Sequence, residues 1–159
     1  MHLAQLNVGV PQGALDGPVM AEFMGNLDRI NALAETSIGY VWRLRDESGN
    51  ATAIESPFGP GVIVNLTVWR DVESLRIFTY RTEHALFLRR RRAWFKETAG
   101  PFMALWWVPE GHRPRLLEAK ARLDALAKHG PTPESFTFTR AFRPDGAVLG
   151  KGERMASHG

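Results

Sequence analysis

Apolar and polar residues follow two different periods along this chain of 159 residues. Alternation with a period of two is typical of a strand that has one buried face, and it recurs in several short segments. A strand that is apolar on both faces is typical of a sheet that is covered on both sides. These patterns predict strands over residues 2–9, 40–45, 62–69, 102–108 and 135–142.

Apolar residues spaced by three and four predict helices over residues 18–36, 72–95 and 115–128. Asp71 stands where it can cap the second of these helices, and Gly130 supplies a C-terminal signal for the third. The order strand–helix–strand–strand–helix–strand is the ferredoxin-like arrangement, which is an antiparallel sheet with helices on one face. The fold class is therefore α+β, with an extra C-terminal helix and strand.

Both faces of the predicted sheet need a cover, because strand 102–108 is apolar on its two faces and strand 62–69 is nearly so. Helices cover one face. The chain offers no spare element for the other face, so we expect the sheet of a second subunit to cover it. This predicts a two-fold homodimer with stacked sheets, which is a dimeric α/β barrel.

Length and composition fit one domain of 1–143 followed by a polar, glycine-rich flexible tail of 144–159. No apolar run is long enough to span a membrane, and the N-terminus has no signal-peptide pattern. The chain has no cysteine, which excludes disulfides, thiolate metal sites and cysteine nucleophiles. These features favour a cytoplasmic protein with no membrane partner.

A net charge of +3, from 20 basic and 17 acidic residues, is too balanced for an obvious nucleic-acid binder. The run of four arginines, 89–92, does not change this picture. Consecutive helical positions point in four directions, so the four side chains cannot follow one phosphate backbone. We expect one of them, Arg91, to face inward and the others to be solvated or ion-paired.

His84 is the strongest catalytic candidate, because it shares one side of the predicted helix with Tyr80, Arg91 and several apolar residues. A histidine can act as a general base near neutral pH, and Arg91 could hold a carboxylate or an enolate. The alternative is a structural histidine with satisfied hydrogen bonds. The helix also has a second apolar side, with Leu75 and Phe78, so the face that points inward stays open.

The chain contains five tryptophans, several of them beside polar residues. Trp106 and Trp107 fit core or interface positions, whereas Trp69 and Trp94 lie near the polar candidates and could line an aromatic pocket. Asn65 is unusual in the middle of an apolar strand, where it could orient a ligand or pair with a neighbouring strand. The histidines show no metal-ligand spacing, and no phosphate-binding loop or hydrolase motif is present.

The junction at 64–75, VNLTVWRDVESL, with a phenylalanine at 78 and a histidine at 84, resembles the dimeric α/β-barrel superfamily. That superfamily includes antibiotic-biosynthesis-type monooxygenases and haem-degrading monooxygenases. Within it, one set of segments is similar to a bacterial family described only as a domain of unknown function. The segments are HLAQLN, GYVWRL, VNLTVW, YRTEHALFLRRRRAWF, LWWVPEGHRP and HGPTPESFTF. This resemblance implies a fold and no established reaction.

Haem-degrading members combine an asparagine on the first strand with a tryptophan and a histidine on the second helix. Asn7 matches the first position, but Phe78 replaces the tryptophan and His84 lies about one turn early. Cofactor-free monooxygenases of the superfamily surround a pocket with asparagine, tryptophan, tyrosine, arginine or histidine. The comparable residues here are Asn65, Trp69, Tyr80, His84 and Arg91.

The resulting prediction is a small-molecule-binding enzyme, monooxygenase-like, that acts on an aromatic or polycyclic substrate without a metal or resident cofactor. The predicted catalytic residues are His84, Arg91 and Asn65. The predicted substrate-binding residues are Trp69, Tyr80, Trp94, Asn7 and Trp42. Two alternatives remain, which are a non-catalytic ligand-binding dimer and a haem protein with His84 as the axial ligand.

Overall fold

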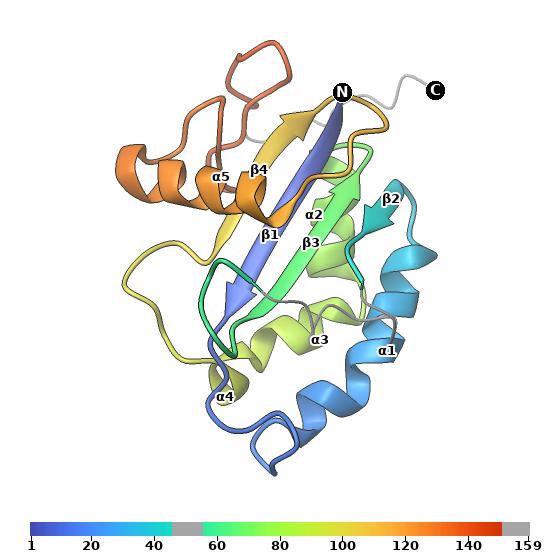
Figure 1. The fold of residues 1–159 in the computed structure, drawn as a ribbon. Coiled ribbons are helices and arrows are strands. Elements are labelled where there is room, and N and C mark those ends of the chain that lie inside the picture. Colours follow the sequence, from blue (N-terminus) through green and yellow to red (C-terminus); the bar gives the residue numbers. More distant parts are fainter. Residues whose placement is uncertain (46–55, 151–159) are drawn as a thin grey trace.

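Four antiparallel strands form the sheet of the computed structural model, which describes residues 1–45 and 56–150 (Figure 1). The strands are β1 (His2–Gly9), β2 (Tyr40–Arg43), β3 (Ile63–Trp69) and β4 (Met103–Val108). Their order across the sheet is β2-β3-β1-β4, so β1 and β3 lie at the centre. This α+β arrangement confirms the ferredoxin-like fold class expected from the first six elements.

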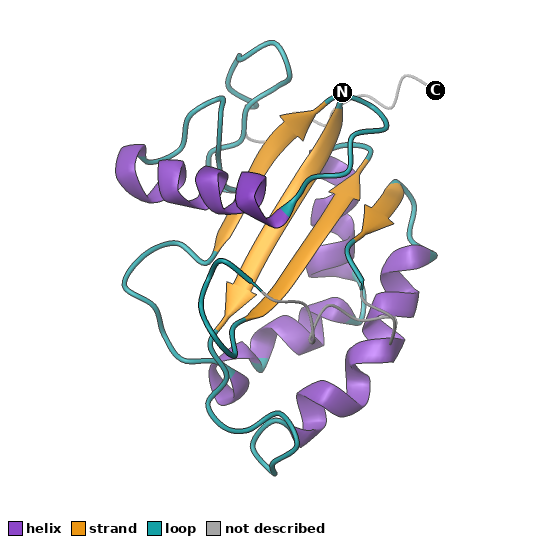
Figure 2. Ribbon diagram, viewed as in Figure 1, coloured by secondary structure: helices purple, strands orange, loops and turns teal. Residues whose placement is uncertain are grey.

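Five helices pack around this sheet within the described residues (Figure 2). They are α1 (Ala21–Glu35), α2 (Val72–Arg81), α3 (His84–Arg89), α4 (Arg91–Trp94) and α5 (Leu116–His129). The Asp71 carboxylate caps α2 as expected, accepting a hydrogen bond of 2.8 Å from the Ser74 backbone N–H. None of these helices is long and apolar enough to cross a membrane.

The alternation along the strands divides the core between the two faces of the sheet. Even-numbered residues of β1, β3 and β4 pack on α5, and odd-numbered residues face α1 and α2. One face therefore carries α1 to α4 and the other carries α5. The buried residues of the α5 face are Ala4, Leu6, Val8, Val64, Leu66, Val68, Ala104, Trp106, Val108, Ala119, Leu123 and Leu126.

The prediction that the chain has no spare element for the second face is wrong. Ala119, Leu123 and Leu126 of α5 pack there against Trp106, whose indole N–H donates to Glu118 at 3.0 Å. Leu66, in the middle of the same face, is already 1% exposed in a single chain. Stacking on a second sheet is thus not needed to bury this face. The homodimer stays a prediction, but an uncovered sheet face no longer supports it.

The single helix expected over 72–95 is also wrong, because the structure breaks it into α2, α3 and α4. Thr82 adopts an extended conformation, with φ −114° and ψ −176°, at the end of α2. Its hydroxyl donates to the Phe78 carbonyl at 2.6 Å and accepts from the His84 N–H at 3.2 Å. The hydroxyl thereby satisfies backbone groups on both sides of the break.

The expected strand over 135–142 is not formed. Only Phe136 bridges to the sheet, through two backbone hydrogen bonds with Leu105 of 2.8 and 2.9 Å. The following turn is held by the Thr137 hydroxyl, which bonds the Thr139 hydroxyl and accepts from the Arg140 N–H. Such side-chain bonds compete with a strand ladder.

Part of the expected tail is tied to this segment. The Arg143 N–H donates to the Ala147 carbonyl at 2.7 Å, and the Leu149 N–H donates to the Ala141 carbonyl at 2.8 Å. Residues 144–150 therefore hydrogen-bond to the domain rather than extending freely from it. The remainder of the expected tail, 151–159, lies outside the described residues.

Candidate functional site

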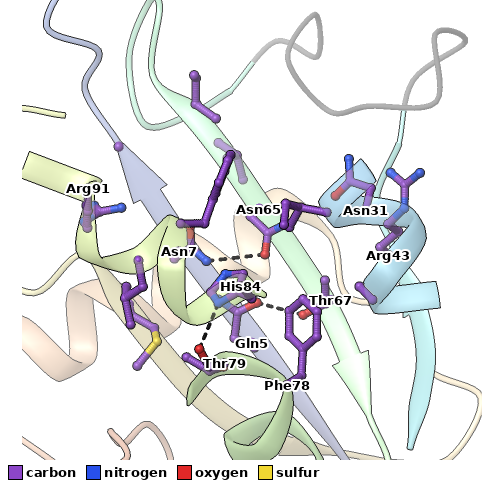
Figure 3. A pocket seen from close by; sticks show the side chains of 18 of the residues that line it. Gln5, Asn7, Asn31, Arg43, Asn65, Thr67, Phe78, Thr79, His84 and Arg91 are labelled. Carbon is purple, nitrogen blue, oxygen red and sulfur yellow. Dashed lines mark hydrogen bonds between the residues drawn. The ribbon is translucent and has the colours of Figure 1, made fainter. Parts of the chain in front are cut away.

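A cavity of about 150 Å³ lies between the sheet and helices α1 to α4 (Figure 3). Strands β1 and β3 form its floor, α1 forms one wall, and α2 to α4 form the other wall. Six of the residues predicted for the site line this cavity, and two do not. The six are Asn7, Asn65, Trp69, His84, Arg91 and Trp94.

Tyr80 is not among the cavity residues, although it was expected on the same helix side as His84. It is half exposed and its ring packs edge-on against Phe138 at 5.5 Å. The break at Thr82 explains the difference, since it changes the phase of the helix. Before the break, Phe78 and its neighbours face the cavity, and after it His84 and Arg91 do.

Trp42 also lies away from the cavity, where it packs on the core of the α5 face. Tyr40, two residues earlier, contacts Trp69 on the cavity face. Two residues apart on a regular strand share a face, but the pairing of β2 with β3 shifts register between Tyr40 and Trp42. This irregularity moves Trp42 to the other side of the sheet and turns Arg43 toward the cavity.

The floor of the cavity consists of two polar pairs that face each other across β1 and β3. Asn7 lies opposite Asn65, and Gln5 lies opposite Thr67. The Asn7 amide N–H donates to Asn65 Oδ1 at 3.3 Å, which is one of the pairings that the sequence left open. Asn65 thus has a strand partner and also lines the cavity, and its own amide nitrogen donates to no group in the described part of the chain.

A directed chain of hydrogen bonds fixes the amide of Gln5. The Trp69 indole N–H can only donate, and it donates to the Thr67 hydroxyl oxygen at 2.9 Å. The Thr67 hydroxyl therefore donates onward to Gln5 Oε1, at 2.7 Å. Gln5 Nε2 is left outside the chain. This nitrogen has no hydrogen-bond partner among the described residues, and Gln5 lines the cavity, so a ligand in the cavity could accept from it.

His84 lines the same cavity as Gln5 (Figure 3). Its Nδ1 is 3.1 Å from the Thr79 carbonyl oxygen. A carbonyl can only accept, so Nδ1 carries a proton and Nε2 of the neutral ring has a free lone pair. Burial lowers the pKa of His84, and the Thr79 hydrogen bond opposes this effect only in part. The side chain is therefore a neutral, oriented base at neutral pH.

Arg91 is the member of the arginine run that faces inward, as expected. It donates to the Val8 carbonyl at 2.8 Å, and its guanidinium lies 3.9 Å from the centre of the Phe102 ring. Arg90 and Arg92 lie at the surface, each within ion-pair distance of a glutamate, at 2.9 and 3.9 Å. This placement confirms the expected division of the run.

Residues 2–151 match the family described as "Domain of unknown function (DUF3291)". The chain belongs to this family. A comparison with curated proteins finds no match. Among solved structures, the chain is similar to SnoaB, a cofactor-independent oxygenase from Streptomyces nogalater, at 18% identity. One structure of SnoaB and one of a SnoaB mutant each give a TM-score of 0.46, covering 71% and 72% of this chain and 98% of the other.

Five polar residues that line the cavity of this DUF3291 chain were not predicted as site residues: Gln5, Asn31, Arg43, Thr67 and Thr79. Gln5 and Thr67 could have been found, because polar residues occupy successive odd positions of β1 and β3 on an otherwise apolar strand pattern. Thr79 has no comparable signal. It enters the site through its backbone carbonyl, which any residue type could supply.

The haem alternative does not fit this cavity. An apolar cavity of roughly this volume holds a single benzene-sized ring, and a haem is several times larger. Phe78 fills the space beside His84, with its ring 4.8 Å from the imidazole and 5.0 Å from the Trp69 ring. Within the described residues, no group of three or more histidine, aspartate or glutamate side chains is placed to hold a metal ion.

Proposed function

We propose that the cavity is the active site of a monooxygenase-like enzyme that deprotonates a small cyclic substrate and passes the resulting carbanion to dioxygen. The observation that carries the proposal is the state of His84. Its Nδ1–H is held by the Thr79 carbonyl, which leaves the Nε2 lone pair without a hydrogen-bond partner among the described residues, and His84 lines the cavity. A general base must be unprotonated and aimed at the proton that it removes.

The lowered pKa suits this role at neutral pH. Burial keeps the imidazole of His84 neutral before the reaction. When Nε2 takes the proton, the Thr79 carbonyl still accepts from Nδ1 and stabilises the imidazolium. The proton would come from a phenolic or enolic O–H, or from the adjacent acidic C–H.

The anion that forms needs hydrogen-bond donors close to its oxygen. Gln5 Nε2 and Asn65 Nδ2 are amide donors on the cavity floor that no partner in the described residues uses. Donors that are already in place stabilise developing charge most effectively where water is excluded. The buried Trp69 and Trp94 rings supply that exclusion. Arg91 adds positive charge at one end of the cavity.

The reaction balances with dioxygen as the only oxidant. Loss of one proton from a CH₂ group (or its enol tautomer) next to the carbon that bears the activating oxygen gives a carbanion, and dioxygen forms a C–O bond with it to give a peroxide anion. The peroxide takes a proton and then loses water, which leaves a carbonyl group. One oxygen atom stays in the product and the other leaves as water, so dioxygen accepts four electrons and the substrate, which is the only reductant, is oxidised by four electrons.

The volume of the cavity limits the substrate. About 150 Å³ holds one six-membered ring with small substituents. The proposed substrate is therefore a phenol or cyclic enol with a single ring, and not a polycyclic compound.

Oxygen uptake tests the proposal directly. Purified protein is incubated with phenol, catechol and 1,3-cyclohexanedione, and oxygen consumption and product are recorded. We expect turnover with at least one of them, and a loss of roughly 10²–10⁴-fold in His84→Gln. The exposed His129→Gln is the matched control and should keep full activity. Ligands that raise the melting temperature without any oxygen uptake would instead identify a binding protein and overturn the proposal.

A further inference from the structure

The ionisable side chains that line the cavity are all basic groups. They are Arg43, His84 and Arg91, and no aspartate or glutamate lines it in the described part of the chain. His84 is neutral at neutral pH for the reason given above. The net charge of the cavity therefore depends on whether each arginine pairs with a carboxylate of the protein that lies outside the cavity lining.

Arg43 has such a partner. Its side chain is 8% exposed, and its Nε donates to Glu35 Oε1 at 2.7 Å. In Figure 3, Arg43 lies beside Asn31 on one side of His84, and Arg91 lies on the opposite side. The charge at the Arg43 end is thus balanced by the protein itself.

Arg91 has no carboxylate partner among the described residues. Its one hydrogen bond runs to the Val8 carbonyl, which leaves four of the five guanidinium N–H groups for other acceptors. Its remaining neighbours are the faces of Phe95 and Phe102, whose ring centres lie 5.1 and 3.9 Å from the guanidinium carbon. These rings pack against the guanidinium but carry no negative charge that would neutralise it.

A partly buried, unbalanced cation is costly, and burial lowers the pKa of Arg91 accordingly. A ligand carboxylate would remove this cost, because the guanidinium fork matches a carboxylate and can donate two parallel hydrogen bonds. A neutral ligand would leave the charge unbalanced. The aromatic rings of Phe95 and Phe102 also suit a ring attached to that carboxylate.

We infer that the substrate class is a single-ring carboxylate, with Arg91 binding the carboxylate and the reacting hydroxyl or enol directed toward His84. This inference rests on the proposed function for the His84 end of the cavity only. The affinity for a carboxylate at the Arg91 end needs neither a reacting hydroxyl nor dioxygen. It can therefore be measured separately.

Calorimetric titration with benzoate, benzamide and acetate tests the inference near neutral pH. Benzoate and benzamide have nearly the same shape and differ in charge, and acetate has the charge without the ring. We expect the wild-type protein to bind benzoate at least tenfold more tightly than either of the others. Equal affinity for benzoate and benzamide would overturn the inference, as would the absence of binding by benzoate.

Two neighbouring arginines give a matched pair of variants. Arg91→Gln should weaken benzoate binding roughly tenfold or more and bring it to the level of benzamide. Arg92→Gln, which changes an exposed arginine one position along, should leave both affinities unchanged. Arg91→Lys keeps the charge without the fork and should be intermediate, so the test remains decisive if Arg91→Gln is poorly folded. Unchanged benzoate binding in Arg91→Gln and Arg91→Lys would refute the inference.

The two proposals fail in distinguishable ways. His84→Gln should retain benzoate binding while losing oxygen uptake with 4-hydroxybenzoate. If benzoate binds through Arg91 but no hydroxylated analogue supports oxygen uptake, the carboxylate site stands and the proposed reaction is wrong. If neutral phenols are turned over and benzoate has no advantage over benzamide, the reaction stands and the carboxylate site is wrong.

Discussion

At the scale of single residues, the hydroxyl of Thr67 decides how Gln5 presents its amide to the cavity. The indole of Trp69 occupies the hydroxyl oxygen, so the hydroxyl proton is directed to Gln5 Oε1. All three side chains are nearly or fully buried, at 0–4% exposure. A chain of buried hydrogen bonds that is fully connected specifies one arrangement, and a chain with one missing member does not.

A double-mutant cycle should detect this coupling. Thr67→Val leaves both the Trp69 indole and Gln5 Oε1 without a partner, and we expect it to lower the unfolding free energy by about 1–3 kcal/mol. Gln5→Leu removes the end of the chain and should cost less. The double variant should lose clearly less than the sum of the two, by about 0.5–3 kcal/mol, in urea unfolding followed by circular dichroism. Strict additivity would show that the chain carries no coupling.

His84 predicts a pH dependence of stability. Because its pKa is lowered in the folded protein, the unfolded chain binds more protons as the pH falls below 6.5, the ordinary value. The stabilisation from a neutral His84 is thus complete above that value and is lost as the pH falls through the lower folded-state pKa. We expect His84→Gln to flatten this acid-side loss in urea unfolding. His129→Gln, an exposed control, should keep the wild-type slope.

Polar residues within apolar segments of the sequence identified much of the candidate site. Asn65, His84 and Arg91 were recognised because polar residues in apolar stripes require partners, and all three line the cavity. Tyr80 and Trp42 were misplaced for a common reason. Each position was inferred from regular periodicity, and a helix break or a strand irregularity lies beside each one. Periodicity holds only as far as the element that carries it.

At the scale of elements, the break between α2 and α3 determines where His84 points. Thr82 ends α2 with its hydroxyl on the Phe78 carbonyl, and the same oxygen receives the first backbone N–H of α3, that of His84. In a continuous helix each residue is rotated by about 100° from the one before it, so the direction of the His84 side chain would be set by its distance from Phe78 along the sequence. The break therefore brings Phe78 and His84 to the same cavity.

Thr82→Val tests this role, because valine has the shape of threonine without the hydroxyl. We expect it to lower the unfolding free energy by about 0.5–2 kcal/mol, the range found for lost helix caps, and to reduce oxygen uptake by displacing His84. Thr82→Ser keeps the hydroxyl and should stay close to wild type. Equal stability of the valine and serine variants would show that the hydroxyl does not hold the break.

The sequence predicted well those elements in which the spacing of apolar residues matches the burial seen in the structure. All four strands of the sheet and helices α1 and α5 lie within a few residues of their expected bounds. The segment around Phe136 was misassigned as a strand because alternating aromatics there do serve the core, with Phe136 fully buried and Phe142 6% exposed. The threonines between them form side-chain bonds in a turn, which alternation cannot reveal.

At the scale of the whole molecule, the position of α5 changes the argument about assembly. The sequence showed correctly that both faces of the sheet are covered, but it could not show on which face the last helix packs. Long-range packing of this kind depends on the turn between β4 and α5, not on the periodicity of either element. In the structure, α5 covers the face that a second subunit was expected to cover.

A single chain should therefore be stable without a partner on that face. An obligate dimer is stabilised by mass action, so its melting temperature rises with protein concentration, whereas that of a self-sufficient chain does not. We expect the melting temperature to stay constant over a hundredfold range of concentration, followed by circular dichroism at the dilute end and calorimetry at the concentrated end. A steady rise would mean that burial by α5 is insufficient and that the sheet-stacked homodimer expected from the sequence contributes to folding. Sedimentation velocity over the same range would then show whether dissociation accompanies the loss of stability. A dimer with a constant melting temperature would instead associate through a surface that folding does not need.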